Sequence, residues 1–178
     1  MKKFSLFIIV FSVAAFLIGC HSTSKNSSSV SVSSTQPADA RKSPNGLDPV
    51  NKVDGNLALK GYDVVAYFTE GKAVEGATEF TYDWQGARWQ FVNAANREAF
   101  MQAPEKYAPQ FGGYCAWAVG HGYTANGDPT AWKIVNGKLY LNYNQKVKEK
   151  WEQDEANLIK QGDENFPGFL ENKPEHKG

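Results

Sequence analysis

The chain has 178 residues, and its 19 Lys and Arg residues are balanced by 19 Asp and Glu residues, so the formal net charge is zero at pH 7. With no basic excess to attract a phosphate backbone, we expect no nucleic acid partner. The length suits one domain with a sizeable core, and only two cysteines are present.

The N-terminal segment has the layout of an export signal. Lys2 and Lys3 give it a basic start, residues 4–18 are almost wholly apolar and uncharged, and Leu-Ile-Gly-Cys follows at residues 17–20. This order of charged, apolar and small residues is typical of a secretory signal peptide. The apolar run is shorter than the ~20 residues that a membrane-spanning helix needs, so a permanent span is the weaker interpretation.

The end of this segment resembles a bacterial lipobox. The resemblance implies that Cys20 is lipidated and becomes the first mature residue, whereas the alternative is an ordinary signal peptide with a chance cysteine. Acyl chains would anchor the protein firmly, because each buried CH₂ contributes about 0.8 kcal/mol. His21 follows in place of an acidic retention signal, which in a Gram-negative cell resembles an outer-membrane destination facing the periplasm. Without Lys2 and Lys3 the mature chain has 17 basic and 19 acidic residues, a net charge of −2.

Residues 21–46 have the composition of a flexible linker. They are rich in serine and poor in apolar side chains, so they cannot bury enough surface to offset the entropy of ordering. We interpret them as a tether between the lipid and a folded domain at residues 47–178. That domain contains all five tryptophans and all eight tyrosines.

The first half of this domain shows strand and helix patterns in turn. Residues 63–69 predict a short buried strand, and residues 79–83 and 87–92 predict a hairpin around a turn at 84–86. Four aromatic side chains of the hairpin would share one face: Phe80, Tyr82, Trp89 and Phe91.

Helical signals follow the hairpin. Asn93 is expected to cap a helix over residues 94–102, with Phe100 and Met101 facing inward and Pro104 marking its end. A second helical turn is expected at residues 105–108.

The second half starts with a glycine-rich segment at residues 111–122, which could contain a short helix over residues 115–119. Residues 132–135 and 138–142 predict a second hairpin, because Asn-Gly at 136–137 suits a type I′ turn. Asn144 is expected to cap a final helix to about residue 161, with Val147, Trp151 and Leu158 on its apolar stripe. We therefore expect an α+β domain in which antiparallel hairpins pack against two or three helices.

Five motifs of this domain together resemble those of YHS-domain proteins, over about residues 47–167. They are Gly-Tyr-Asp-Val-Val-Ala-Tyr-Phe at 61–68, Trp-Gln-Phe at 89–91, Pro-Glu-Lys-Tyr at 104–107, Gln-Phe-Gly-Gly-Tyr-Cys at 110–115 and Gly-Lys-Leu-Tyr-Leu-Asn-Tyr at 137–143. The chain is most similar to the secreted branch called YHS domain-containing (seleno)proteins, some of which have selenocysteine at the position of Cys115. The resemblance implies that Cys115 is reactive. Selenocysteine is a softer and more acidic nucleophile than cysteine, whereas it gives little advantage as a side chain that only packs in a core.

The chain departs from the cysteine-rich YHS modules, which resemble small metal-binding domains with several thiols. Asn51 and the segment 91–93 stand where those modules have further cysteines. A four-cysteine zinc site is therefore excluded by count, since structural zinc takes four ligands.

Cys115 is the one cysteine left after the predicted lipidation of Cys20, and three roles remain open for it. In the first, Cys115 is a redox thiol activated at a helix start, with His121 as acid/base partner and an external thiol to complete the cycle. In the second, Cys115 and His121 bind a transition metal such as copper or zinc, or haem iron, with further ligands from Asp63, Asp128 or tyrosines. In the third, Cys115 is buried as a small apolar side chain.

Several other side chains are candidates for a pocket beside Cys115. They are Asp63, Tyr67, Tyr114 and Trp117. Aromatic residues at this density are more often core, and Asp63 could equally terminate a turn. The sequence thus predicts a membrane-anchored lipoprotein with a metal- or redox-linked accessory role centred on Cys115. The alternative is a non-catalytic protein- or ligand-binding module in which Cys115 is structural.

Overall fold

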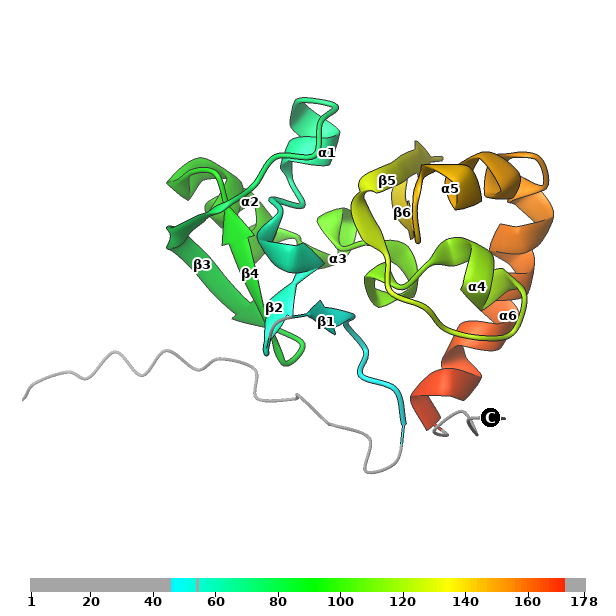
Figure 1. Cartoon of the computed structure of the whole chain (residues 1–178). Coiled ribbons are helices and arrows are strands. Elements are labelled where there is room, and N and C mark those ends of the chain that lie inside the picture. Colours follow the sequence, from blue (N-terminus) through cyan, green and yellow to red (C-terminus); the bar gives the residue numbers. More distant parts are fainter. Residues whose placement is uncertain (1–45, 54, 172–178) are drawn as a thin grey trace, which may run out of the picture. The chain divides into compact units, whose positions relative to one another are not determined.

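A computed structural model describes residues 46–53 and 55–171 (Figure 1). The predicted signal peptide, Cys20 and nearly all of the predicted linker lie outside the described residues. Within those residues, no helix is both long enough and apolar enough to cross a membrane.

The described residues confirm the predicted α+β class. In chain order the elements are β1 (Lys52–Val53), β2 (Leu57–Ala58), the 3-10 helix η1 (Leu59–Gly61), α1 (Ala66–Thr69), β3 (Ala77–Trp84), β4 (Ala87–Phe91), α2 (Ala94–Gln102), α3 (Pro104–Tyr107), the 3-10 helix η2 (Gln110–Gly113), α4 (Ala116–Gly120), β5 (Asp128–Val135), β6 (Lys138–Asn142), α5 (Gln145–Glu152) and α6 (Glu155–Glu171). Among the described helices, only α2, α5 and α6 have eight residues or more.

The strands form two separate sheets, one of four strands in the order β1-β2-β4-β3 and one made by β5 and β6. Both predicted hairpins are confirmed, since β3 pairs with β4 and β5 with β6 in antiparallel fashion. Asn136 and Gly137 have φ values of +51° and +75° between β5 and β6. Positive φ at both positions is what a type I′ turn requires, and it explains why Asn-Gly predicted this hairpin.

A first core forms between the larger sheet and α2. Phe100 of α2 is fully buried, and its ring centroid lies 4.9–6.3 Å from four aromatic rings of β3 and β4. These rings belong to Tyr82, Trp84, Trp89 and Phe91. The expected aromatic face of the hairpin is therefore present, with Phe80 also packed against this core.

A second core lies under α4, α5 and α6. Its fully buried centre is Trp151 of α5, whose ring is 5.5 Å from that of Tyr140 on β6. Phe111, Val119 and Leu158 belong to the same cluster. The predicted cap of α5 is also confirmed, because the Asn144 side chain accepts a hydrogen bond from the Val147 N–H at 2.9 Å.

The predicted strand at residues 63–69 was wrong. This segment turns into α1, because one oxygen of the Asp63 carboxylate accepts hydrogen bonds from the N–H groups of Val65 (2.8 Å) and Ala66 (3.4 Å). An Asp that binds backbone groups two and three residues on starts a turn. The buried apolar run at residues 64–67 fits a buried helix as well as a buried strand, so its pattern could not decide between them.

Two helical details also differ from the prediction. Met101 is 42% exposed instead of facing inward, and the final helix is broken between Glu152 and Glu155. Asp154 lies at the break, where its carbonyl accepts from the Leu158 N–H and its side chain from the Asn157 amide. Asp is a residue type that favours helix starts, so it begins α6 as a new helix.

Asp63 joins three parts of the first core. Its side chain is completely buried, and its second oxygen accepts from the Val92 N–H at 2.8 Å and from the Asn96 side chain at 2.7 Å. The carboxylate thereby ties α1 to the end of β4 and to α2.

We predict that Asp63→Asn lowers the free energy of unfolding by about 3 kcal/mol, because an amide NH₂ would face backbone donors and leave them unpaired. Urea unfolding monitored by circular dichroism would measure the change. Asp83→Asn is the matched control, since Asp83 forms an exposed ion pair with Arg88 that water screens. Equal losses in the two variants would contradict this role of Asp63.

Candidate functional site

A close backbone contact places Cys115. Gly112 has a φ of +59°, and a Cβ added to it would lie 2.0 Å from the Pro49 carbonyl oxygen, so no larger residue fits there. The Asn51 N–H donates to the Gly112 carbonyl at 2.8 Å, and the Cys115 N–H donates to the Ala125 carbonyl at 2.8 Å. The segment that carries the thiol is therefore held from both sides by backbone hydrogen bonds.

Cys115 is the residue from which α4 begins, as the sequence indicated. The residue is only 1% exposed. Its Sγ lies 3.2 Å from the Tyr143 backbone nitrogen, whose N–H donates to it, and 3.9 Å from Oδ1 of Asn142, toward which the thiol can donate. The Tyr143 backbone and the Asn142 side chain thus both approach the sulfur.

Two opposing effects act on the thiol pKa. Burial is the larger one and raises the pKa of Cys115 above its ordinary value of 9.0. The backbone N–H groups of Ala118, Tyr143 and Trp117 act in the opposite direction, because they stabilise a negative sulfur. The resting group is therefore a neutral thiol that already faces donors suited to its anion.

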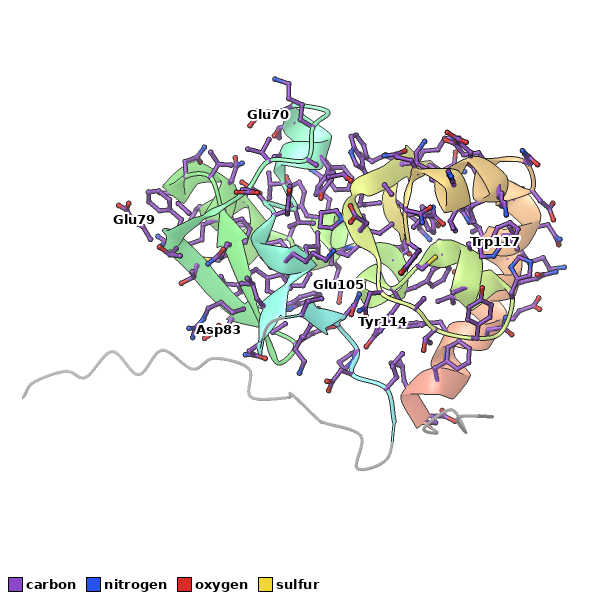
Figure 2. The ribbon with its side chains drawn as sticks, in the orientation of Figure 1. Glu70, Glu79, Asp83, Glu105, Tyr114 and Trp117 are labelled. Carbon is purple, nitrogen blue, oxygen red and sulfur yellow. The ribbon has the colours of Figure 1, made fainter. Side chains whose placement is uncertain are left out.

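The Cys115 residue lines a small pocket of about 240 Å³. The rest of its wall comes from Trp117, Ala118, Tyr123, Ala125, Tyr143 and Val147. Tyr123 and Tyr143 are about half exposed, at 50% and 57%, so the pocket has aromatic walls that reach the surface. Of the predicted pocket residues, Trp117 lines this pocket, and its side chain on α4 is labelled in Figure 2.

Asn142 is a site residue that sequence reasoning missed. It is fully buried at the end of β6, and its Oδ1 accepts from the Trp117 N–H at 3.1 Å as well as lying beside the sulfur. Its Nδ2 has no hydrogen-bond partner among the described residues. A polar residue that ends an otherwise apolar strand was the only sequence signal for this position.

His121 lies at the other end of α4 from Cys115. Six residues separate the two along the chain, or about 9 Å for a helix rise of 1.5 Å per residue. The His121 Nδ1 is 2.8 Å from the Trp117 carbonyl, and its ring lies 4.2 Å from the Trp117 ring. In residues 46–53 and 55–171, no three His, Cys, Asp or Glu side chains gather closely enough to hold a metal ion.

The other predicted pocket residues have separate places in the fold. Asp63 caps α1, and the Tyr67 hydroxyl donates to the Pro129 carbonyl at 2.9 Å. The Tyr114 hydroxyl donates to the Asp48 carbonyl at 3.2 Å, and burial raises the pKa of Tyr114 to about 12. None of these three residues lines the pocket of Cys115.

Comparison with protein-family models, with curated proteins and with solved structures gave no match to this chain.

We predict that the Cys115 thiol titrates at a higher pH in the folded protein than in the unfolded chain, because burial disfavours its anion. Thiolate absorbance at 240 nm, taken as the difference between wild type and Cys115→Ser, would give the midpoint. Since the pKa is raised in the fold, this group's contribution to stability is present below the unfolded pKa and is lost as pH rises through the folded pKa. A folded midpoint below that of the urea-unfolded chain would contradict the prediction.

Proposed function

We propose that this protein is an envelope lipoprotein of YHS-like type whose domain uses Cys115 as a slow redox thiol with an external thiol partner. The observation that carries the proposal is the Cys115 sulfur, which accepts the Tyr143 N–H at 3.2 Å while its residue lines a 240 Å³ pocket. A cysteine that only fills space needs neither a pocket nor backbone donors to its sulfur.

The donors explain how a buried thiol could react. The thiolate is the reactive form, and burial keeps its population low at neutral pH. The N–H groups of Trp117, Ala118 and Tyr143 would stabilise the anion once the proton leaves, and they offset part of the rise in pKa that burial causes. The result is a thiol that reacts slowly and survives in an oxidising compartment, where a fully exposed thiolate would be consumed.

The chemistry balances with a peroxide as oxidant and a low-molecular-weight thiol as reductant. The Cys115 thiolate attacks one peroxide oxygen, the S–O bond forms as the O–O bond breaks, and the released hydroxide takes a proton to leave as water. An external thiol then condenses with the sulfenic acid, forming an S–S bond and a second water. A second external thiol attacks the mixed disulfide, which restores Cys115 and releases the oxidised thiol pair.

Metal binding is less well supported by the same region. Cys115 and His121 lie at opposite ends of α4, and the described residues bring no third ligand of the His, Cys, Asp or Glu type to either one. A zinc site takes three or four protein ligands.

We predict that the native protein treated with hydrogen peroxide and dimedone gains one dimedone adduct at Cys115, detected by mass spectrometry. Ala125→Leu would slow this reaction several-fold, because the larger side chain fills the pocket in front of the sulfur. Ala95→Leu, on the exposed surface of α2, is the matched control and would leave the rate unchanged.

The competing role is a structural cysteine in a non-catalytic binding module, favoured by the 1% exposure of Cys115. Labelling that requires denaturant, or a labelling rate equal to the rate of global unfolding, would establish that role and overturn the redox proposal. A Cys115→Ser protein that still gains the adduct would also contradict it.

The predicted anchor has its own test. We expect Cys20→Ala to abolish acylation and to release the domain from the membrane fraction, since Cys20 is the predicted lipid carrier. Metabolic labelling with a fatty acid and fractionation of the cell envelope would measure both effects. A variant that keeps its lipid would contradict the lipobox interpretation, without affecting the redox proposal for Cys115.

A further inference from the structure

A second and larger cavity lies apart from the Cys115 pocket. It has a volume of about 780 Å³, within the range of about 300–1,000 Å³ that small-molecule sites occupy. Its walls come from the segment 48–52, the turn between β3 and β4, the segment 108–112 and one face of α6. Cys115 does not line it, so its function is independent of the redox proposal.

The charged side chains of this cavity are mostly acidic. Asp48, Glu105 and Asp163 line it, together with a single basic residue, Lys52. The Lys52 ammonium is already paired with the Asp48 carboxylate at 3.2 Å and donates to the Gly86 carbonyl at 3.4 Å. Among the described residues, no other side chain or backbone group is within hydrogen-bond or ion-pair distance of the carboxylates of Glu105 and Asp163.

Pro167 of α6 lies in the same wall of the cavity and removes one hydrogen bond from the helix. Pro167 lies inside the helix and has no N–H, so the carbonyl of Asp163 receives no hydrogen bond from the residue four positions later. Asp163 and Pro167 both line the cavity. The Asp163 carbonyl therefore lacks its usual partner within the helix.

Aromatic side chains form the apolar part of the wall. Trp84, Trp89, Phe111 and Phe166 all line the cavity. The Trp89 indole N–H donates to the Trp84 carbonyl at 3.1 Å, so it is not available to a ligand. Aromatic rings attract cations through their negative faces, and they offer apolar contact to alkyl groups at the same time.

We infer that this cavity is a binding site for a small organic cation, such as an alkylammonium compound. The ligand's positive charge would lie near Glu105 and Asp163, and its alkyl groups would lie against Trp84 and Phe166. A small anion or a strong acceptor is disfavoured, because the cavity's one ammonium group is engaged by Asp48 and Gly86.

Choline is the probe for this site, and 3,3-dimethylbutan-1-ol, its uncharged carbon analogue, is the matched neutral probe. The full chain would be titrated with each compound while the indole N–H signals of Trp84 and Trp89 are followed by NMR. We expect saturable shifts of these two signals with choline and much weaker binding of the alcohol.

The carboxylates are tested by a Glu105→Gln, Asp163→Asn double variant. Both residues are exposed, so the fold should tolerate the change, and we expect choline affinity to fall about fivefold or more. The control is Glu70→Gln, Glu79→Gln, which removes two carboxylates that do not line the cavity; Glu70, Glu79 and Glu105 are labelled in Figure 2.

Three results would overturn the inference. One is the absence of saturable shifts with choline, and another is equal affinity for the neutral alcohol, which would indicate a site without charge selection. The third is an equal loss of affinity in the double variant and its control, which would indicate general attraction to a negative surface.

Discussion

The close backbone contact at Gly112 is the constraint on which the rest of the site depends. Gly112 lies against the Pro49 carbonyl with no room for a side chain, and the next residue, Gly113, also has a positive φ of +82°. Together they turn the chain so that Cys115 pairs with Ala125 and lies beside β6. A side chain at Gly112 would clash with Pro49 and Val50. It would thereby disturb the pairing of Cys115 with Ala125 and its position beside β6.

This one segment contributes to both of the cavities described above. Gln110, Phe111 and Gly112 line the larger cavity, and Cys115 lines the smaller one. The two cavities nevertheless have different chemistry. The larger one combines carboxylates with indole rings, whereas the smaller one presents a single sulfur within aromatic walls.

The Cys115 site balances two effects of burial. Removal from water raises the thiol pKa, which lowers reactivity, yet it also strengthens the hydrogen bonds that the backbone N–H groups of α4 and Tyr143 can make to a negative sulfur. Asn142 takes part in this balance, since its side-chain oxygen binds the Trp117 N–H and approaches the sulfur. A buried thiol with a raised pKa and nearby N–H donors is suited to slow thiol chemistry and not to fast turnover.

The sequence by itself determined the features whose signals are local. Asn-Gly predicted the β5–β6 turn, and Asn93 and Asn144 predicted two helix starts, because each depends on the φ preference or side-chain length of one or two residues. Only the tertiary structure decided that Asp63 turns a predicted strand into α1, that Asn142 lies beside the sulfur, and that His121 lies at the far end of α4. These outcomes depend on contacts between residues that are far apart in the sequence, such as those of Asp63 with Val92 and Asn96. The spacing of residues along the chain does not predict such contacts.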